Sequence, residues 1–438
     1  MRQLSRIWMV VMLVGAAVAV QARTIYLEAD GSGDYATVQS AIDDSNDRDV
    51  ILLRPGTYTG DGNRDLDYKG KAITVSGIDP NDPTVVAATI IDCNVSNEDC
   101  HRGFFFHSGE DANSILKGIT IENGYHHFAG AIYCLQSSPL IADCVFLDNS
   151  CGDHGGAVYN DSNSSPIINN CVFNGNLAWE GAGIYNDEGS CPTISFCRFT
   201  ANIAGHEGGA IRNNEYSHPT LINCIVSGNL AGASGGGMDN DDVSWPTLTN
   251  CIFVGNRAGV SGGAIDSWEQ SHPTIRNCIF RQNRALLGHE IYLDDDYPGL
   301  ATVAYSNIEG GQNEVYVGGD STLNWGSGNI DTDPLFVDPG YWDPNDTPVD
   351  ANDDFFVPGD YHLKSQGGRY NPMAQVWVYD DVTSPCIDTG DPDIPIAFEP
   401  FLNGAIINLG AYGGTAEASK SPSGLHSNFS YVNHRLCR

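Results

Sequence analysis

The sequence predicts an all-β protein, a parallel β-helix, on two observations. A sequence motif recurs about six times between residues 128 and 293, at spacings of 27 or 26 residues. A fixed period of this size is typical of solenoids and arrays. Each period holds three short β-prone pieces separated by Gly, Asn, Asp and Ser, which supply turns. Three short strands per period predict one coil of a β-helix, with successive coils about 4.8 Å apart.

The repeat places like residues in columns. One apolar column contains Ile132, Val158, Ile184, Ile211, Met238, Ile265 and Ile291, and two more contain Ile or Leu and mostly Phe. These columns are expected to fill the interior. A column of asparagines closes each period, at Asn149, Asn176, Asn202, Asn229, Asn256 and Asn283. We expect these side chains at a tight turn, where stacked amides hydrogen-bond along the stack.

The first residues have the pattern of a secretory signal peptide. Arg2 and Arg6 precede an apolar run from Ile7 to Val14, and small residues continue to Ala22. A membrane anchor is the alternative, but the apolar run is short for a full span. We therefore expect cleavage after Ala22 and a secreted, periplasmic or cell-surface protein.

The formal net charge of the chain is −34. This charge excludes nucleic acid as a natural partner, because phosphate binding needs a basic face. It also argues against electrostatic capture of a polyanionic sugar unless cations bridge the two. Acidity that only keeps an exported rod soluble is the simpler interpretation.

The chain has 13 cysteines, which in an exported protein normally suggest disulfides. Six of them occupy one repeat column, and we expect these to be buried thiols. Better disulfide candidates lie outside the column: Cys93 with Cys100, and Cys191 with Cys151 or Cys134.

The segment before the repeats predicts a strand, a short helix and a second strand. Val38, Ala41 and Ile42 have the apolar spacing of a helix, and Asp49 to Tyr58 gives a strand that ends in Pro-Gly-Thr-Tyr. This segment resembles the entry of right-handed parallel β-helix proteins of the pectin-lyase-like superfamily. The Gly-Gly-Ala-Ile and Phe-x-x-Asn repeats are similar to those of bacterial surface β-helices, including the polymorphic outer-membrane proteins. The resemblance implies a right-handed coil with an N-terminal helical cap.

The domain organisation follows from these patterns. Residues 1–22 are the signal peptide, and residues 23–415 form a single β-helix domain with its regular repeats at 128–293. Residues 311–415 are expected to supply the last rungs and an irregular C-terminal cap, because terminal rungs would otherwise expose the core. Residues 416–438 carry no periodicity and are predicted to be a loose tail.

One outward column predicts a groove that binds sugar rings. It contains Tyr133, Tyr159 and Tyr185, and the column two residues further on contains Asp161, Asp187 and Trp268. Apolar faces of sugars stack on aromatic rings, and sugar hydroxyls hydrogen-bond to carboxylates. A solvent-facing strand that tolerates Tyr and Asp, with Tyr favoured by β-propensity, is the alternative.

The column before the glycine pairs contains the candidate catalytic residues His154, Glu180 and Glu207, on adjacent rungs. A histidine and two carboxylates can perform acid/base chemistry or hold a divalent metal. Polar residues that only border a glycine turn are the alternative. Paired carboxylates at this spacing also occur in glycosidases.

Pectate-lyase relatives use Ca²⁺ with an Arg or Lys base. The chain approaches that arrangement at Arg212, a further candidate catalytic residue, beside Asp239 and Asp241, the candidate Ca²⁺ ligands. The set of motifs that marks polygalacturonases is absent.

We favour the first of two functional classes and keep the second as the alternative. In the first, an exported monomer binds an extracellular glycan along the Tyr/Asp groove and cleaves it as a polysaccharide lyase or glycoside hydrolase, or binds it without catalysis. In the second, it is a non-catalytic surface rod with an adhesive face. Near-perfect repetition favours the rod, and the change of pattern at Glu180, Glu207 and Arg212 favours the glycan.

Overall fold

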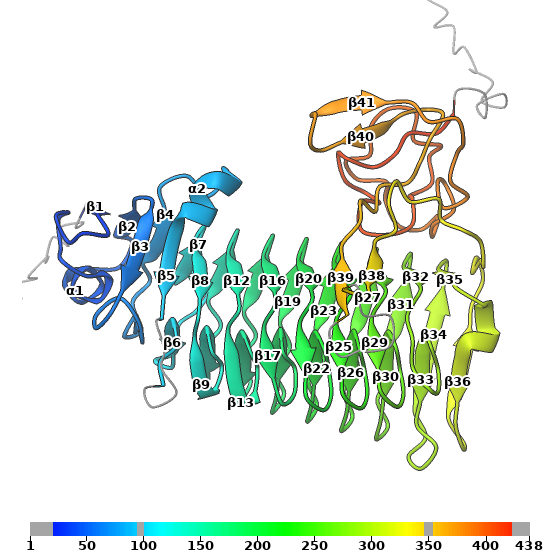
Figure 1. Cartoon of the computed structure of the whole chain (residues 1–438), viewed down its shortest axis with the longest axis horizontal. Helices are drawn as coiled ribbons and strands as arrows, with labels where there is room; N and C mark the ends of the chain where they lie inside the picture. Colours follow the sequence, from blue (N-terminus) through cyan, green and yellow to red (C-terminus); the bar gives the residue numbers. More distant parts are fainter. Residues whose placement is uncertain (1–20, 94–99, 346–353, 423–438) are drawn as a thin grey trace, which may run out of the picture.

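A computed structural model describes residues 21–93, 100–345 and 354–422. The predicted signal peptide, apart from its last two residues, and most of the tail lie outside these ranges. The chain coils into a rod of stacked parallel strands (Figure 1). None of the helices in the described ranges is long and apolar enough to cross a membrane.

Three long parallel sheets form the walls of the rod. The twelve-stranded sheet contains β1 (Thr24–Leu27), β2 (Val50–Leu53), β4 (Thr74–Gly77), β7 (Ile115–Lys117), β11 (Leu140–Ala142), β15 (Ile167–Asn169), β19 (Thr193–Ser195), β23 (Thr220–Ile222), β27 (Thr247–Thr249), β31 (Thr274–Arg276), β34 (Leu300–Ala304) and β37 (Thr322–Trp325). The ten-stranded sheet contains β3 (Gly56–Thr59), β5 (Thr89–Asp92), β8 (Thr120–Glu122), β12 (Val145–Leu147), β16 (Val172–Asn174), β20 (Arg198–Thr200), β24 (Ile225–Ser227), β28 (Ile252–Val254), β32 (Ile279–Arg281) and β35 (Asn307–Ile308). The nine-stranded sheet contains β6 (Phe104–Phe106), β10 (Ile132–Leu135), β14 (Val158–Asp161), β18 (Ile184–Asn186), β22 (Ile211–Asn213), β26 (Met238–Asn240), β30 (Ile265–Ser267), β33 (Ile291–Leu293) and β36 (Val315–Val317).

A shorter fourth sheet runs beside the nine-stranded one. This six-stranded sheet contains β9 (Tyr125–Phe128), β13 (Ser150–His154), β17 (Leu177–Ala178), β21 (Ile203–Ala204), β25 (Leu230–Ala231) and β29 (Arg257–Ala258). The predicted register is confirmed: Phe146 pairs with Phe173, and Ile184 pairs with Ile211. The prediction of an all-β parallel β-helix is therefore confirmed.

The interior is built from the predicted ladders. Phe146, Phe173 and Phe199 are fully buried, and their ring centroids stack at 4.7 and 4.5 Å. Burial of each such ring stabilises the fold by about 1.5–3 kcal/mol. At the N-terminal end of the rod, α1 (Val38–Asp44) is the predicted short helix, and its apolar residues Val38, Ala41 and Ile42 pack into the same core. The other helices are α2 (Pro83–Ala88) and η1 (Gly311–Glu314).

The asparagine column forms the predicted amide ladder. Asn202 Nδ2 donates to Asn229 Oδ1 at 2.9 Å and to the Phe173 carbonyl at 3.0 Å. Its own Oδ1 accepts from the backbone and side-chain nitrogens of Asn176. A second, unpredicted ladder links serines at the opposite turn, where the backbone nitrogen of Ser217 donates to Ser244 Oγ. These ladders pair buried polar groups that would otherwise destabilise the interior.

All twelve cysteines in the described ranges are free thiols. The repeat column is buried as expected, and Cys171 N donates to Cys197 Sγ at 3.4 Å. The disulfides suggested for Cys93 with Cys100, and for Cys191, are not formed in this structure.

After β37 the chain folds back along the outside of the rod (Figure 1). This C-terminal segment, described over residues 331–345 and 354–422, contains the hairpins β38 (Tyr341–Asp343) with β39 (Phe355–Val357) and β40 (Arg369–Asn371) with β41 (Val376–Val378). Phe336, Phe356 and Leu409 pack on the outward residues Ile225, Ile252 and Ile279 of the ten-stranded sheet. Residues 416–422, expected to begin the tail, pack with this segment: Ala418 is buried and Ser419 Oγ donates to the Leu363 carbonyl.

Candidate functional site

The candidate site lies at the corner where the six-stranded sheet meets the nine-stranded sheet. A residue in the left-handed region turns the chain between them: Ala129 on the first rung, at φ +55°, and glycine on later rungs, as at Gly208 with φ +66°. A Cβ on Gly208 would lie 2.7 Å from the Ile211 carbonyl and 2.8 Å from Arg212 Cβ, so only glycine fits this close turn. The turn brings two predicted columns into contact: His154 from one stacks on Tyr185 from the other, with ring centroids 4.4 Å apart. We call this surface the corner.

The tyrosines and aspartates of the predicted groove bond to one another. Tyr133 donates to Asp161 Oδ2 at 2.6 Å, and Tyr159 donates to Asp187 Oδ2 at 2.9 Å. Tyr159 and Tyr185 are only 5% and 2% exposed, whereas Tyr133 is half-buried. Burial raises the pKa of both Tyr159 and Tyr185, and the neighbouring Asp187 adds to the shift at Tyr159. Most of this column is therefore a packed layer beneath the surface.

Trp268 lies further along the rod, beyond the carboxylate-rich middle rungs. Its ring is half-buried and tilted against Tyr292, with centroids 6.0 Å apart. Its Nε1 is buried without a hydrogen-bond partner in the described ranges. The structure thus separates Trp268 from the tyrosines with which the sequence analysis grouped it.

Arg212 is the buried centre of the corner. Its guanidinium donates to Asp239 Oδ1 at 2.9 Å and to Asp241 Oδ2 at 3.0 Å. It also contacts Glu207, and its Nε lies 3.4 Å from Glu180 Oε2. Burial opposes its charge, but Asp239, Glu180 and the other neighbouring groups together raise the pKa of Arg212.

The aspartates beside Arg212 are strongly desolvated. Burial raises the pKa of Asp239 to about 7, although Arg212 opposes the shift. Asp266, on the next rung, is fully buried, and neither of its oxygens has a hydrogen-bond partner in the described ranges. Burial and the neighbouring Asp239 raise its pKa well above the ordinary value. Asp239 and Asp241 thus bind Arg212 in this structure, and their role as Ca²⁺ ligands stays a prediction.

Glu180 and Glu207 lie on adjacent rungs, as predicted, and share a histidine that the sequence analysis missed. His206 Nδ1 lies 3.4 Å from Glu180 Oε1 and 3.4 Å from Glu207 Oε1. The predicted partner His154 lies on the other side of Glu180, with Nε2 3.5 Å from Oε2. The ligand atoms of Glu180, His206 and Glu207 all lie within 4.8 Å of one another.

Trp179 covers His206 and was also missed. The two rings are nearly parallel, at 2°, with centroids 5.3 Å apart, and Trp179 is 52% exposed. A Cβ on Gly205 would lie 2.9 Å from Trp179 Cε3, so this glycine leaves room for the indole. The available signal was the shorter rung of Trp179, where one residue separates Ala178 from Glu180, whereas two residues separate Ala204 from Glu207 on the next rung.

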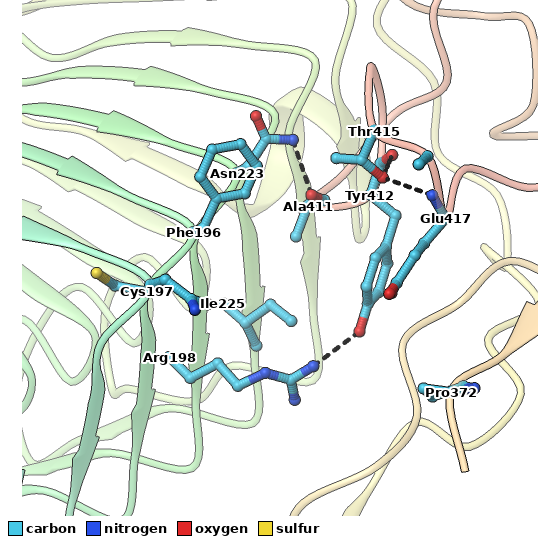
Figure 2. Close-up of a pocket in the computed structure, with 12 residues that line it drawn as sticks. Phe196, Cys197, Arg198, Asn223, Ile225, Pro372, Ala411, Tyr412, Thr415 and Glu417 are labelled. Carbon is cyan, nitrogen blue, oxygen red and sulfur yellow. Dashed lines mark hydrogen bonds between the residues drawn. The ribbon is translucent and has the colours of Figure 1, made fainter. Parts of the chain in front are cut away.

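A second hollow lies between the rod and the C-terminal segment (Figure 2). It has a volume of about 480 Å³, and Arg198 Nη2 donates to the Tyr412 hydroxyl across it at 2.9 Å. His362 stacks on Tyr412 at 3.7 Å and lies between Asp360 and Glu417. These contacts fix the C-terminal segment to the rod.

The comparisons with known proteins agree with this architecture. The family model described as "Right handed beta helix region" matches residues 67–206 and 178–330, which together are more than half of the chain. The chain belongs to this right-handed β-helix family. No curated protein matches the sequence.

Two solved structures are similar to the chain. The crystal structure of pectate lyase Pel9A has 14% identity and a TM-score of 0.48, over 90% of this chain and 97% of that one. The pectin methylesterase from carrot has 14% identity and a TM-score of 0.32, over 60% of this chain and 82% of that one.

Proposed function

We propose that this protein is exported and binds a polysaccharide at the corner, with Trp179 as the platform for a sugar ring. The observation that carries the proposal is the half-exposed indole of Trp179, held parallel to His206 beside Glu180 and Glu207. An aromatic face offers apolar contact to a sugar ring, and carboxylates accept hydrogen bonds from hydroxyls. The binding surface is thus shifted from the buried tyrosines to the adjoining sheet.

The geometry argues against an inverting hydrolase and against Arg212 as a catalytic base. The facing oxygens of Glu180 and Glu207 lie within 4.8 Å of one another. Inverting glycosidases separate their carboxyl groups by about 6.5–9.5 Å to admit water, so this close pair argues against inversion, whereas retaining enzymes use about 5–5.5 Å. Arg212 has a raised pKa and stays protonated, so we assign it the positioning of the two glutamates rather than proton abstraction.

A binding screen with a matched tryptophan pair tests the proposal. The purified mature protein is measured by affinity electrophoresis on polyuronates and neutral glycans, and products are assayed as reducing ends and as unsaturated ends. Trp179→Ala should weaken glycan binding by about tenfold, the scale of one aromatic contact. Trp245→Ala is the control, because Trp245 is 45% exposed and also stacks on a histidine, His218, at 5.1 Å, but lies on a different turn.

Equal binding by the two tryptophan variants would reject the corner as the site. Absence of binding across the panel would leave the second function, a structural rod. The Asn, Ser and Tyr/Asp ladders favour that second function, because their polar groups hydrogen-bond to one another between rungs and need no ligand. Export is tested separately, by locating the mature chain outside the cytoplasm and sequencing its first residues.

A further inference from the structure

We propose that Glu180, His206 and Glu207 form a binding site for one divalent transition-metal ion. Two carboxylate oxygens and one imidazole nitrogen, on neighbouring rungs, lie within 4.8 Å of one another. His206 Nδ1 is equally distant, at 3.4 Å, from Glu180 Oε1 and Glu207 Oε1. Three such atoms converging on one point are the donor set of a three-ligand metal site.

The surrounding contacts orient all three ligands. Arg212 contacts the Oε2 atoms of both glutamates and so leaves their Oε1 atoms facing His206. The imidazole is held by its backbone, which donates to the Trp179 carbonyl at 2.8 Å, and by the indole stacked on its ring. His206 Nδ1 is buried and makes no hydrogen bond in the described ranges. A ligand atom that is oriented and free of hydrogen bonds is ready to bind a cation.

The local charge also favours a cation. Glu180, Glu207, Asp239 and Asp241 surround the single guanidinium of Arg212, so negative charge is in excess. The imidazole favours Zn²⁺ and the two carboxylates also suit Mn²⁺, whereas Ca²⁺ prefers six to eight oxygen ligands. Three protein ligands leave a coordination position open for water or another oxygen ligand. The metal site does not depend on the glycan proposal, although a bound sugar would lie beside it.

The test measures metal binding with no glycan present. The mature chain is treated with EDTA, dialysed and titrated with Zn²⁺ by calorimetry and with Mn²⁺ by electron paramagnetic resonance. Mn²⁺ is included because it binds thiols poorly, and Cys100 and Cys191 are not buried. We expect one Zn²⁺ or Mn²⁺ per chain, and at least a tenfold loss of affinity in His206→Ala. His218→Ala, which alters a histidine stacked on Trp245, should bind as the wild type does.

Glu207→Gln provides a second variant that keeps the shape of the side chain, and it should also lose affinity while circular dichroism stays unchanged. Failure of wild-type protein to bind either ion, or equal binding by wild type and His206→Ala, would overturn the proposal. Because the titrations contain no glycan, binding of one ion by the wild type is decided whether or not Trp179 binds a sugar, which separates this inference from the proposed function.

Discussion

The ring of Phe356 lies directly over Gly228: a Cβ on Gly228 would be 2.1 Å from Phe356 Cγ. This contact joins the C-terminal segment to a turn of the rod. The same ring also covers Gly255, one rung later, where a Cβ would lie 2.5 Å from Cε2. One aromatic side chain therefore occupies the space of two absent side chains.

Gly228→Ala should detach the C-terminal segment without unfolding the rod. The positive φ of +63° is not the main obstacle, because Ala201 occupies the same turn one rung earlier at φ +55°. The collision with Phe356 is the obstacle, and it should destabilise the docked segment by about 1–3 kcal/mol. Limited proteolysis should then cut between residues 331 and 422 several times faster. Gly175→Ala is the matched control, because its Cβ would meet only the movable side chain of Asp148. Equal proteolysis of the two variants would contradict this account.

Asn202→Ala should destabilise the rod strongly. The substitution removes the side-chain bonds to Asn229 and Phe173 and leaves the buried backbone nitrogen of Asn176 without its acceptor, whereas Asn176 Nδ2 keeps the Phe146 carbonyl. Each buried unpaired group costs about 1–3 kcal/mol, so we expect a loss of about 3 kcal/mol or more in the free energy of unfolding. Urea denaturation measures it. Thr193→Ala, at an exposed strand position, should change stability by less than about 1 kcal/mol.

Arg212→Met should destabilise the protein by about 3–5 kcal/mol, because it leaves buried carboxylates without their cation. The loss should shrink as the pH falls from 8 to 5, since protonation of Asp239, whose pKa is about 7, relieves the repulsion. Thermal unfolding at the two pH values measures the difference. Arg54→Met removes an exposed pair with Glu28 and should cost less than about 1 kcal/mol at either pH. A pH-independent loss in Arg212→Met would contradict the electrostatic explanation.

The wild-type protein should be more stable at pH 5 than at pH 8. Burial raises the pKa of Glu290 to about 8, although Asn283 opposes the shift, and it raises the pKa of Glu399 to about 7, as it does for Asp239. These folded-state values exceed the unfolded values near 4, so the folded state holds more protons between them. The resulting stability is present below about pH 4 and is lost as the pH rises through the folded pKa values.

Differential scanning calorimetry across this range should show a falling midpoint temperature. Glu290→Gln should flatten part of the fall, because the amide oxygen can still accept from Asn283 but does not titrate. Asp320→Asn, at an exposed position, should leave the curve unchanged. A midpoint that rises with pH would contradict the assignment of these buried acids.

The rod could be predicted because the residues of each interior column recur at a fixed spacing in the sequence. A fixed spacing that repeats Phe146, Phe173 and Phe199 determines both the coil and the register. The amide ladder could be predicted for the same reason. The C-terminal segment lacks this periodicity, and nothing local to Phe356 identifies Gly228 as its partner.

The candidate site was predicted only in part. Glu180 and Glu207 follow from the column, but burial of Tyr159 and Tyr185 depends on two columns that face each other across a glycine turn. His206 was missed because it lies one position before the column of His154, Glu180 and Glu207, and only the shorter rung before it, with Trp179 next to Glu180, gives it two partners. To predict contacts between two columns, one needs the angle between the strands on either side of the turn, and the spacing of residues in the sequence does not provide it.

The C-terminal segment constrains the number of coils in the part of the rod that it contacts. Asn223 Nδ2 donates to the carbonyls of Ala411 and Gly413, Asn250 Nδ2 donates to the Gly413 carbonyl, and Asn277 Oδ1 accepts from the backbone nitrogen of Asp391. The C-terminal segment is thus hydrogen-bonded to three consecutive rungs, and these bonds form only when the rungs keep their present spacing. Whole coils added before Asn223 would leave these hydrogen bonds in place. An extra coil between Asn223 and Asn277 would separate some of the three asparagines from their partners in the C-terminal segment. The contacts therefore constrain the spacing from Asn223 to Asn277 and leave the number of coils before Asn223 free.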